Sequence, residues 1–154
     1  MKRLLFVLFI AVAFVSCEGP MGPQGPAGES GGRRDYMSFV IRSNEWLIPE
    51  YDGKPAIPGT SQFYYYRELS WDALDELAVE QGVVVGYVLD FTGAYTTLPH
   101  VFHDKNYNEE WTETTSLSFF KGGVEIQVTN SDFADVRPGD KSFRLVVDIK
   151  SGLR

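Results

Sequence analysis

Glycine stands at every third position of one stretch near the N-terminus, and this periodicity keeps the stretch out of any folded core. Glycine occurs at residues 19, 22, 25, 28 and 31, and proline follows three of these glycines. A segment without large apolar side chains cannot offset the conformational entropy that folding removes. A core therefore has to come from the residues that follow, and a chain of 154 residues has room for one domain of ordinary size.

The residues ahead of the repeat have the form of an export signal. Lys2-Arg3 precedes an unbroken apolar run, Leu4–Val15, which ends at Ser16. A positive head, a short apolar run and a small residue at its end are typical of signal peptides. The run is shorter than the roughly 20 apolar residues of a membrane span. A buried core helix is the other interpretation, but it does not explain the positive head. We expect residues 1–16 to be a signal peptide.

Cys17 follows the apolar run directly and is the single cysteine of the chain, which excludes a disulfide within it. The segment Phe14-Val15-Ser16-Cys17 resembles the lipobox of bacterial lipoproteins, in which a diacylglyceryl group is attached to the thiol before cleavage. Phe14 departs from the usual Leu at that position. The resemblance implies lipidation at Cys17 and a lasting attachment to a membrane. A signal without lipidation, which would leave a free thiol, is the alternative.

The glycine repeat has the pattern of collagen, where only Gly fits the axis of the triple helix. Its few triplets favour a semi-rigid spacer over a stable triple helix. We assign residues 17–34 to the lipidated Cys and this spacer, which at about 3.1 Å per residue would hold a domain roughly 40 Å from the membrane. A lipobox Cys followed by Glu-Gly-Pro and Gly-Pro-x triplets is similar to Gram-negative lipoproteins with collagen-like segments, whose C-terminal domains are mostly of unknown function. This resemblance covers residues 1–32 and implies a cell-envelope location, with the outer membrane expected, but no chemistry.

The charge of the chain excludes one class of partner. The chain has 14 basic and 21 acidic side chains, and loss of residues 1–16 would remove two basic and no acidic ones, leaving a net charge of −9. Such a surface repels phosphate backbones, so we expect no nucleic-acid partner. It also gives no help in binding anionic lipids, so the anchor has to supply the membrane attachment.

Residues 35–154 have the pattern of a β-rich domain. Alternation of apolar and polar residues predicts strands, with Met37, Phe39 and Ile41 on one face of the first and Leu145 and Val147 on the inner face of the last. The nearly continuous apolar run Val83–Phe91 predicts a central strand, with Val85, Tyr87 and Leu89 buried. Between residues 111 and 120, Trp111, Leu117 and Phe119 share one face, while Thr114 and Ser116 lie on the outer face.

Turn and cap residues complete the expected fold. Lys121-Gly122-Gly123 between two alternating runs predicts a hairpin. Ser70 and Gly82 are suited to begin and end a helix over residues 71–81. Residues 48–61, with three prolines and two glycines, predict a long loop. The fold class is mainly β: an antiparallel sandwich or a small α+β roll with about six strands and one short helix.

Few residues suggest chemistry. His100 and His103, with Asp104, could ligate zinc, but the third His is missing, and on a strand residues 100 and 103 point to opposite faces. The single Cys is expected to be acylated, no Gly-x-Ser-x-Gly motif occurs, and neighbouring carboxylates are expected by chance in so acidic a chain. We expect no metal, no cofactor and no catalytic residue, and therefore no enzyme.

Aromatic side chains are the remaining candidates. In Phe63-Tyr64-Tyr65-Tyr66, alternate rings leave a strand by opposite faces, so one pair is exposed if the other packs in the core. We take Tyr64, Tyr66 and Trp111 as possible ligand-binding residues, although core packing and cross-strand pairing are the commoner roles of such rings in β proteins. The expected function is a non-enzymatic interaction or structural module of an envelope lipoprotein, with a protein or a glycan as partner. A carbohydrate-binding accessory lipoprotein is the alternative.

Overall fold

The computed structural model describes residues 32–105 and 110–150. Its elements in chain order are β1 (Arg33–Ile41), the 3-10 helix η1 (Ser43–Glu45), β2 (Glu50–Tyr51), β3 (Lys54–Pro55), β4 (Tyr65–Ser70), α2 (Glu76–Gln81), β5 (Gly82–Leu89), β6 (Tyr95–Thr97), β7 (His100–Lys105), β8 (Glu110–Phe120), β9 (Gly123–Asn130) and β10 (Lys141–Ile149). Sheet A has the order β1-β10-β5-β6 and sheet B the order β4-β9-β8-β7; β2 and β3 form a small separate hairpin. All pairings are antiparallel.

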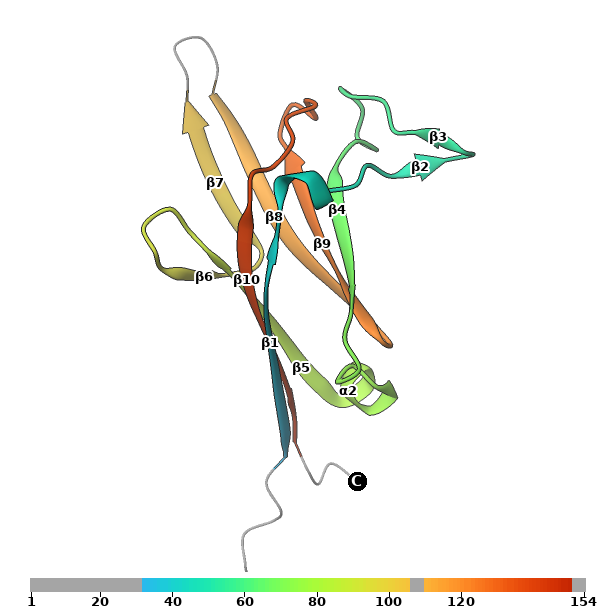
Figure 1. The fold of residues 1–154 in the computed structure, drawn as a ribbon, viewed down its shortest axis with the longest axis vertical. Coiled ribbons are helices and arrows are strands. Elements are labelled where there is room, and N and C mark those ends of the chain that lie inside the picture. The colour runs from blue at the N-terminus through green and yellow to red at the C-terminus, as the bar shows by residue number, and fades with distance from the viewer. Residues whose placement is uncertain (1–31, 106–109, 151–154) are drawn as a thin grey trace, which may run out of the picture.

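The two four-stranded sheets pack face to face and enclose the core (Figure 1). One core cluster joins Phe143 and Val88 of sheet A to Ile126 and Val128 of sheet B. A second joins Leu145 of sheet A to Val124 of sheet B. The prediction of a mainly β fold is therefore confirmed, and of the two expected architectures the structure has the antiparallel sandwich. At one end of the sandwich α2 and the turn before it cover the core with three buried side chains, Trp71, Leu74 and Ala78.

Alternation in β1 and β10 places the predicted residues inside. Leu145 and Val147 are fully buried, and Met37 and Phe39 of β1 pack against the same cluster. In β5 the predicted phase is wrong: Val88 is buried, whereas Leu89 is 37% exposed and Val83 is exposed as well. Both faces of β5 are apolar, so the composition of the run gave no indication of which face turns inward.

Gly86 explains how β5 fits against the core. A Cβ at this position would come within 2.8 Å of the side chains of both Leu117 and Leu98. The absent side chain therefore leaves room for Leu117 of the opposite sheet and for Leu98 of the turn between β6 and β7. The inward residues of β5 are accordingly Val84, Gly86 and Val88, and the outward ones Val83, Val85, Tyr87 and Leu89.

The turns confirm some predictions and correct others. Phe120 pairs with Gly123 across a two-residue turn, and Gly122 has a φ of +88°, a conformation that favours glycine, so the predicted hairpin is confirmed. The helix is shorter than predicted: Ser70 ends β4, and Asp75 caps α2 by accepting a hydrogen bond from the Ala78 amide. Its expected end at Gly82 is confirmed.

Four strands were not predicted. The small hairpin β2–β3 lies within the segment expected to be a loop, and β6 has only three residues. The histidine segment forms β7, which pairs with β8 from His100 to Lys105. Short edge strands bury little apolar surface, so they carry little periodic signal.

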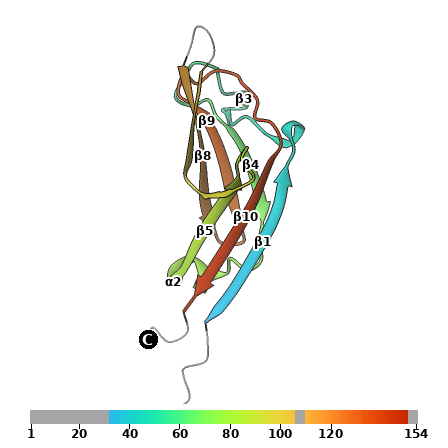
Figure 2. The same ribbon diagram turned by 90° about the vertical axis from the view of Figure 1, so that its left-hand side faces the viewer.

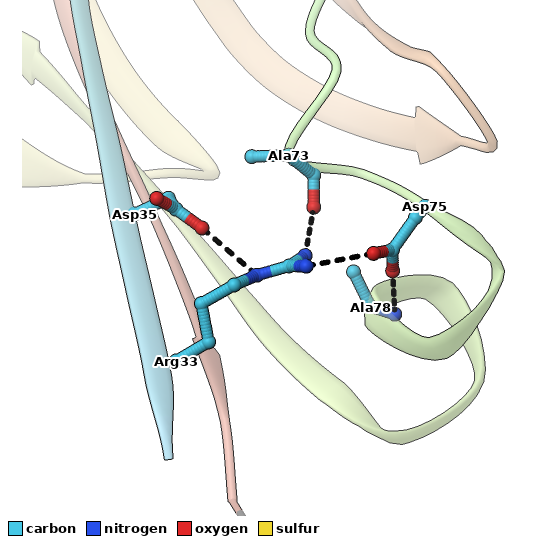
Figure 3. Close-up of polar contacts among 5 residues, drawn as sticks. All are labelled: Arg33, Asp35, Ala73, Asp75 and Ala78. Atoms are coloured by element: carbon cyan, nitrogen blue, oxygen red, sulfur yellow. Dashed lines mark hydrogen bonds and ion pairs between the residues drawn. The ribbon is translucent and has the colours of Figure 1, made fainter. Parts of the chain in front are cut away.

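The first and last strands bring both ends of the described domain to the same end of the sandwich (Figure 1). Arg33 and Arg34, assigned to the spacer from the sequence, belong to β1 and pair with Ile149 and Asp148. The Arg33 guanidinium lies 3.0 Å from the Asp35 carboxylate and donates to the Asp75 carboxylate at 2.7 Å and to the Ala73 carbonyl at 2.6 Å (Figure 3). Arg33 thus ties the start of β1 to the cap of α2.

Candidate functional site

The outer face of sheet A carries a regular grid of side chains, which we call the A face. The strand registers align its nine members in three rows across β1, β10 and β5: Arg34, Asp148 and Val83; Tyr36, Val146 and Val85; Ser38, Arg144 and Tyr87. Together with Gln81 and Lys150 these residues line a hollow of about 930 Å³. Figure 2 shows β5, β10 and β1 side by side. The A face therefore offers one continuous, gently hollowed surface.

The centre of the A face is apolar and uncovered. Tyr36 is 77% exposed and Val83 is 61% exposed, and Val85, Tyr87 and Val146 beside them are half-buried. Antiparallel sheets with one solvated face normally place polar residues there. A contiguous exposed apolar surface typically marks a site of protein, membrane or ligand contact.

Charged groups surround this apolar centre. Arg34 forms an ion pair with Asp148 across the two strands, with the guanidinium Nε 3.0 Å from the carboxylate. The Arg144 guanidinium lies over the ring of Tyr95 of β6, 4.4 Å from its centroid. Such a cation–π contact holds the guanidinium beside the ring and keeps its charge near the surface.

Sheet B presents a different outer face. Its outward side chains are mainly hydroxyl, amide and carboxylate groups: Glu68, Glu125, Gln127, Thr129, Thr112, Thr114, Ser116 and Ser118, with Tyr64 and Tyr66 beside them. Of the larger apolar side chains on this face, Val101 of β7 and Phe120 of β8 are exposed. This face has the composition expected of a sheet surface in water.

The structure separates the three residues predicted to bind a ligand. Tyr64 and Tyr66 lie on the outer face of sheet B, with ring centroids 6.2 Å apart and planes at 60°. Trp111 is half-buried and has the same parity along β8 as the buried Thr115, so it lies on the opposite face of sheet B. Tyr64 and Tyr66 come together without forming a flat platform, and Trp111 is not part of their site. Cys17, the predicted lipidation site, lies outside the described residues.

Tyr64 is held by the β2–β3 hairpin. Its hydroxyl lies near that of Tyr51, a residue that the sequence did not single out. Burial, together with the nearby Tyr51 and Glu125, raises the pKa of Tyr64 to about 12. The neutral phenol is therefore the form present near neutral pH, and it is engaged within the molecule.

The histidines do not converge on one site. His100 and His103 lie on β7 at positions that face opposite ways, and His103 Nδ1 is 3.0 Å from the Thr112 hydroxyl. His100 lines a second hollow of about 440 Å³, where Lys141 Nζ lies 2.6 Å from the Glu113 carboxylate. Across residues 32–105 and 110–150 no group of three or more His, Cys, Asp or Glu side chains is placed to hold a metal ion.

The A face was missed from the sequence, although a signal for it exists. Strand β5 is apolar on both faces, and from this composition the sequence predicts a central strand with Val85, Tyr87 and Leu89 buried. In an antiparallel sandwich the strands of each sheet have one outward face, so apolar residues there point to a surface that something else covers. The exposed Tyr36 of β1 and Val146 of β10 add to the same surface.

Comparison with protein-family models, curated proteins and solved structures gives no match to this chain. Among the helices of the described ranges, none is long and apolar enough to cross a membrane.

Proposed function

We propose that the protein is a membrane-anchored envelope lipoprotein whose β domain is a non-enzymatic interaction module, and that its partner docks on the A face. The observation that carries the proposal is the uncovered apolar centre of the A face, with Tyr36 and Val83 largely exposed. Burial of such a surface stabilises a complex by about 25 cal/mol per Å² of apolar area. The A face therefore supplies a driving force for association that the polar outer face of sheet B lacks.

The anchor part of the proposal rests on the N-terminal sequence. The signal-like residues 1–16, the lipobox-like segment ending at Cys17 and the Gly-Pro repeat support a lipid-anchored protein with a spacer. Acyl chains buried at roughly 0.8 kcal/mol per CH₂ would hold the protein on its membrane. The outer membrane is the location that we propose.

Carbohydrate binding has less support from the geometry. A sugar platform needs exposed rings that lie flat, whereas the rings of Tyr64 and Tyr66 meet at 60° and neither side chain is fully exposed. On the A face, aliphatic side chains such as Val83 and Val85 offer no hydrogen bonds to sugar hydroxyls. The protein partner is therefore the proposal that we develop.

The anchor is tested by Cys17→Ala. We expect this variant to lose lipid attachment, measured as loss of incorporated labelled fatty acid, and to leave the membrane fraction. Ser16→Ala, which keeps a small residue beside the intact Cys17, is the control and should stay in the membrane. A Cys17→Ala protein that remains membrane-bound after a high-salt wash would contradict the lipid anchor.

The docking face is tested by site-specific photo-crosslinking in intact cells. A photoreactive amino acid at position 87 lies on the A face, and one at position 114 lies on the outer face of sheet B. We expect discrete protein adducts from position 87 and none from position 114. Equal labelling from both positions, or none from position 87, would overturn the proposed docking face.

A further inference from the structure

The A face is locally basic on an acidic molecule. Arg34, Arg144 and Lys150 line it together with a single carboxylate, that of Asp148. Asp148 is paired with Arg34, and in the described part of the chain neither Arg144 nor Lys150 has a carboxylate partner. The face thus has two uncompensated positive charges, whereas the whole chain has a net charge of −7.

The positions of the charges relate them to the apolar centre. Arg144 pairs with Tyr87 in the strand register, at one end of the grid, and Lys150 lies at the other end. The valines Val83, Val85 and Val146 lie between them. A ligand that contacts the valines therefore lies near Arg144 at one end and Lys150 at the other. Both cations attract carboxylates more strongly where the ligand displaces water.

The apolar centre distinguishes between acidic ligands. The neutral side chains of this surface that can hydrogen-bond sugar hydroxyls are Ser38, Gln81, Tyr36 and Tyr87, and they share it with three valines that offer no such bond. Aliphatic side chains instead favour the Leu, Ile, Val or Phe side chains of a protein. A second copy of this chain fits less well, because the one carboxylate of the A face, Asp148, is already paired with Arg34 and cannot neutralise Arg144 or Lys150 of an opposing A face.

On the basis of the proposed function, we infer that the A face binds an acidic segment of a partner protein, with apolar side chains on the valines and carboxylates near Arg144 and Lys150. The basic groups select the segment by charge, and the apolar centre supplies most of the affinity. Binding should therefore weaken as the salt concentration rises, since the charges lie at the surface.

The inference is tested on the full chain purified in detergent with two fluorescent peptides. Both carry Leu along one side of an amphipathic helix; the flanking residues are Glu in one peptide and Lys in its twin. We expect fluorescence anisotropy to show tight binding of the Glu peptide and weaker binding of the Lys peptide. Arg144→Gln should lower the affinity for the Glu peptide about two- to fivefold, the range expected for the loss of an exposed ion pair.

Matched variants separate the A face from general effects of charge. Val83→Asp places a carboxylate in the apolar centre and should lower the affinity for the Glu peptide about tenfold or more. Val101→Asp makes the same change at an exposed valine of sheet B and should have no effect. Lys54→Gln removes a positive charge from the β2–β3 hairpin and serves as the control for Arg144→Gln.

Three results would overturn the inference. In the first, the two peptides bind equally. In the second, neither peptide binds while position 87 still crosslinks in cells. Either result would leave the proposed docking face intact but exclude an acidic segment as its ligand. Binding of a sulfated oligosaccharide that Val83→Asp abolishes would assign the face to an anionic glycan instead. Loss of crosslinking from position 87 would instead refute the proposed function itself.

Discussion

The two sheets of this sandwich have the same number of strands and share one core, but their outer faces differ in kind. Sheet B turns hydroxyl, amide and carboxylate groups outward, as in the row Tyr66, Gln127 and Ser116. Sheet A turns out Tyr36, Val146 and Val85 in the equivalent position of its grid. The core requires nothing of either outer face, so the difference cannot be a demand of folding. The comparison therefore supports the proposal that the A face serves contact with another molecule.

The largest expected effect separates the inner face of sheet A from its outer face. Leu145→Ala removes a side chain with no exposed surface and should lower the free energy of unfolding by about 2–5 kcal/mol. Leu89→Ala, at an outward position of β5, should cost about 1 kcal/mol or less. Chemical denaturation of both variants measures the difference. Equal losses would mean that the outer face of sheet A is also part of the core, and the comparison would fail.

The second effect concerns a tyrosine on the inner face of sheet B. The buried Tyr65 hydroxyl donates to the Asp135 carboxylate, and Tyr65→Phe should cost about 1.5–3 kcal/mol by removing a hydrogen bond to a charged group. Tyr66→Phe, one residue on and facing outward, is the control and should cost less. Thermal unfolding of the two variants compares them directly.

Tyr65 also gives the domain a defined response to alkali. Burial, with the Asp135 hydrogen bond, raises the pKa of Tyr65 to about 12 from the ordinary 10.0. The folded state therefore favours the neutral phenol, and the contribution of Tyr65 to stability is complete below pH 10 and is lost as the pH rises towards 12. Tyr64 has a similarly raised pKa and contributes over the same window. The unfolding midpoint of Tyr65→Phe should therefore fall less steeply than that of the wild type as the pH rises from about 10 to about 12. A decline identical to that of the wild type would contradict this assignment.

The third effect exchanges the characters of the two outer faces. Val85→Thr makes the A face more polar, and Thr114→Val makes the outer face of sheet B more apolar. Each should change stability by less than about 1 kcal/mol, because neither residue is fully buried. Crosslinking from position 87 should fall with Val85→Thr and remain unchanged with Thr114→Val. If the two substitutions reduced crosslinking alike, the distinction between the faces would carry no functional meaning.

The smallest effect lies at the end of the sandwich, away from both outer faces. The hydrogen bond from Arg33 lowers the pKa of Asp75 below the ordinary 3.8, so its contribution to stability is present above that value and is lost as the pH falls below it. Asp75→Asn keeps a residue able to cap α2 but removes the charge. When unfolding is measured at decreasing pH, the free energy of unfolding of this variant should fall slightly less steeply than that of the wild type. Asp72→Asn, at a neighbouring exposed carboxylate, is the control.

The sequence predicted the sandwich because its inner positions alternate strictly, as in Phe143, Leu145, Val147 and Ile149 of β10. It did not predict the phase of β5, because period-two alternation disappears when both faces are apolar and Gly86 leaves a gap in the inner one. The site was missed for the same reason. The A face comes from three strands that are distant in sequence, and only the registers of β1, β10 and β5 bring Tyr36, Val146 and Val85 into one row.

The nine-residue pairing of β1 with β10 has a mechanical consequence for a domain held by its N-terminal end. Ladder hydrogen bonds lie across the strands, so a pull on the chain ahead of Arg33, directed along β1, loads them in shear and all together instead of opening them one by one. The Arg33 guanidinium passes part of that load to Asp75 and the Ala73 carbonyl in the turn before α2, which covers one end of the sandwich. The strands that would carry the tension, β1 and β10, are also two of the three that form the A face. If the protein is anchored and binds a partner as proposed, a force between the partner and the anchor would therefore run mainly along these two strands.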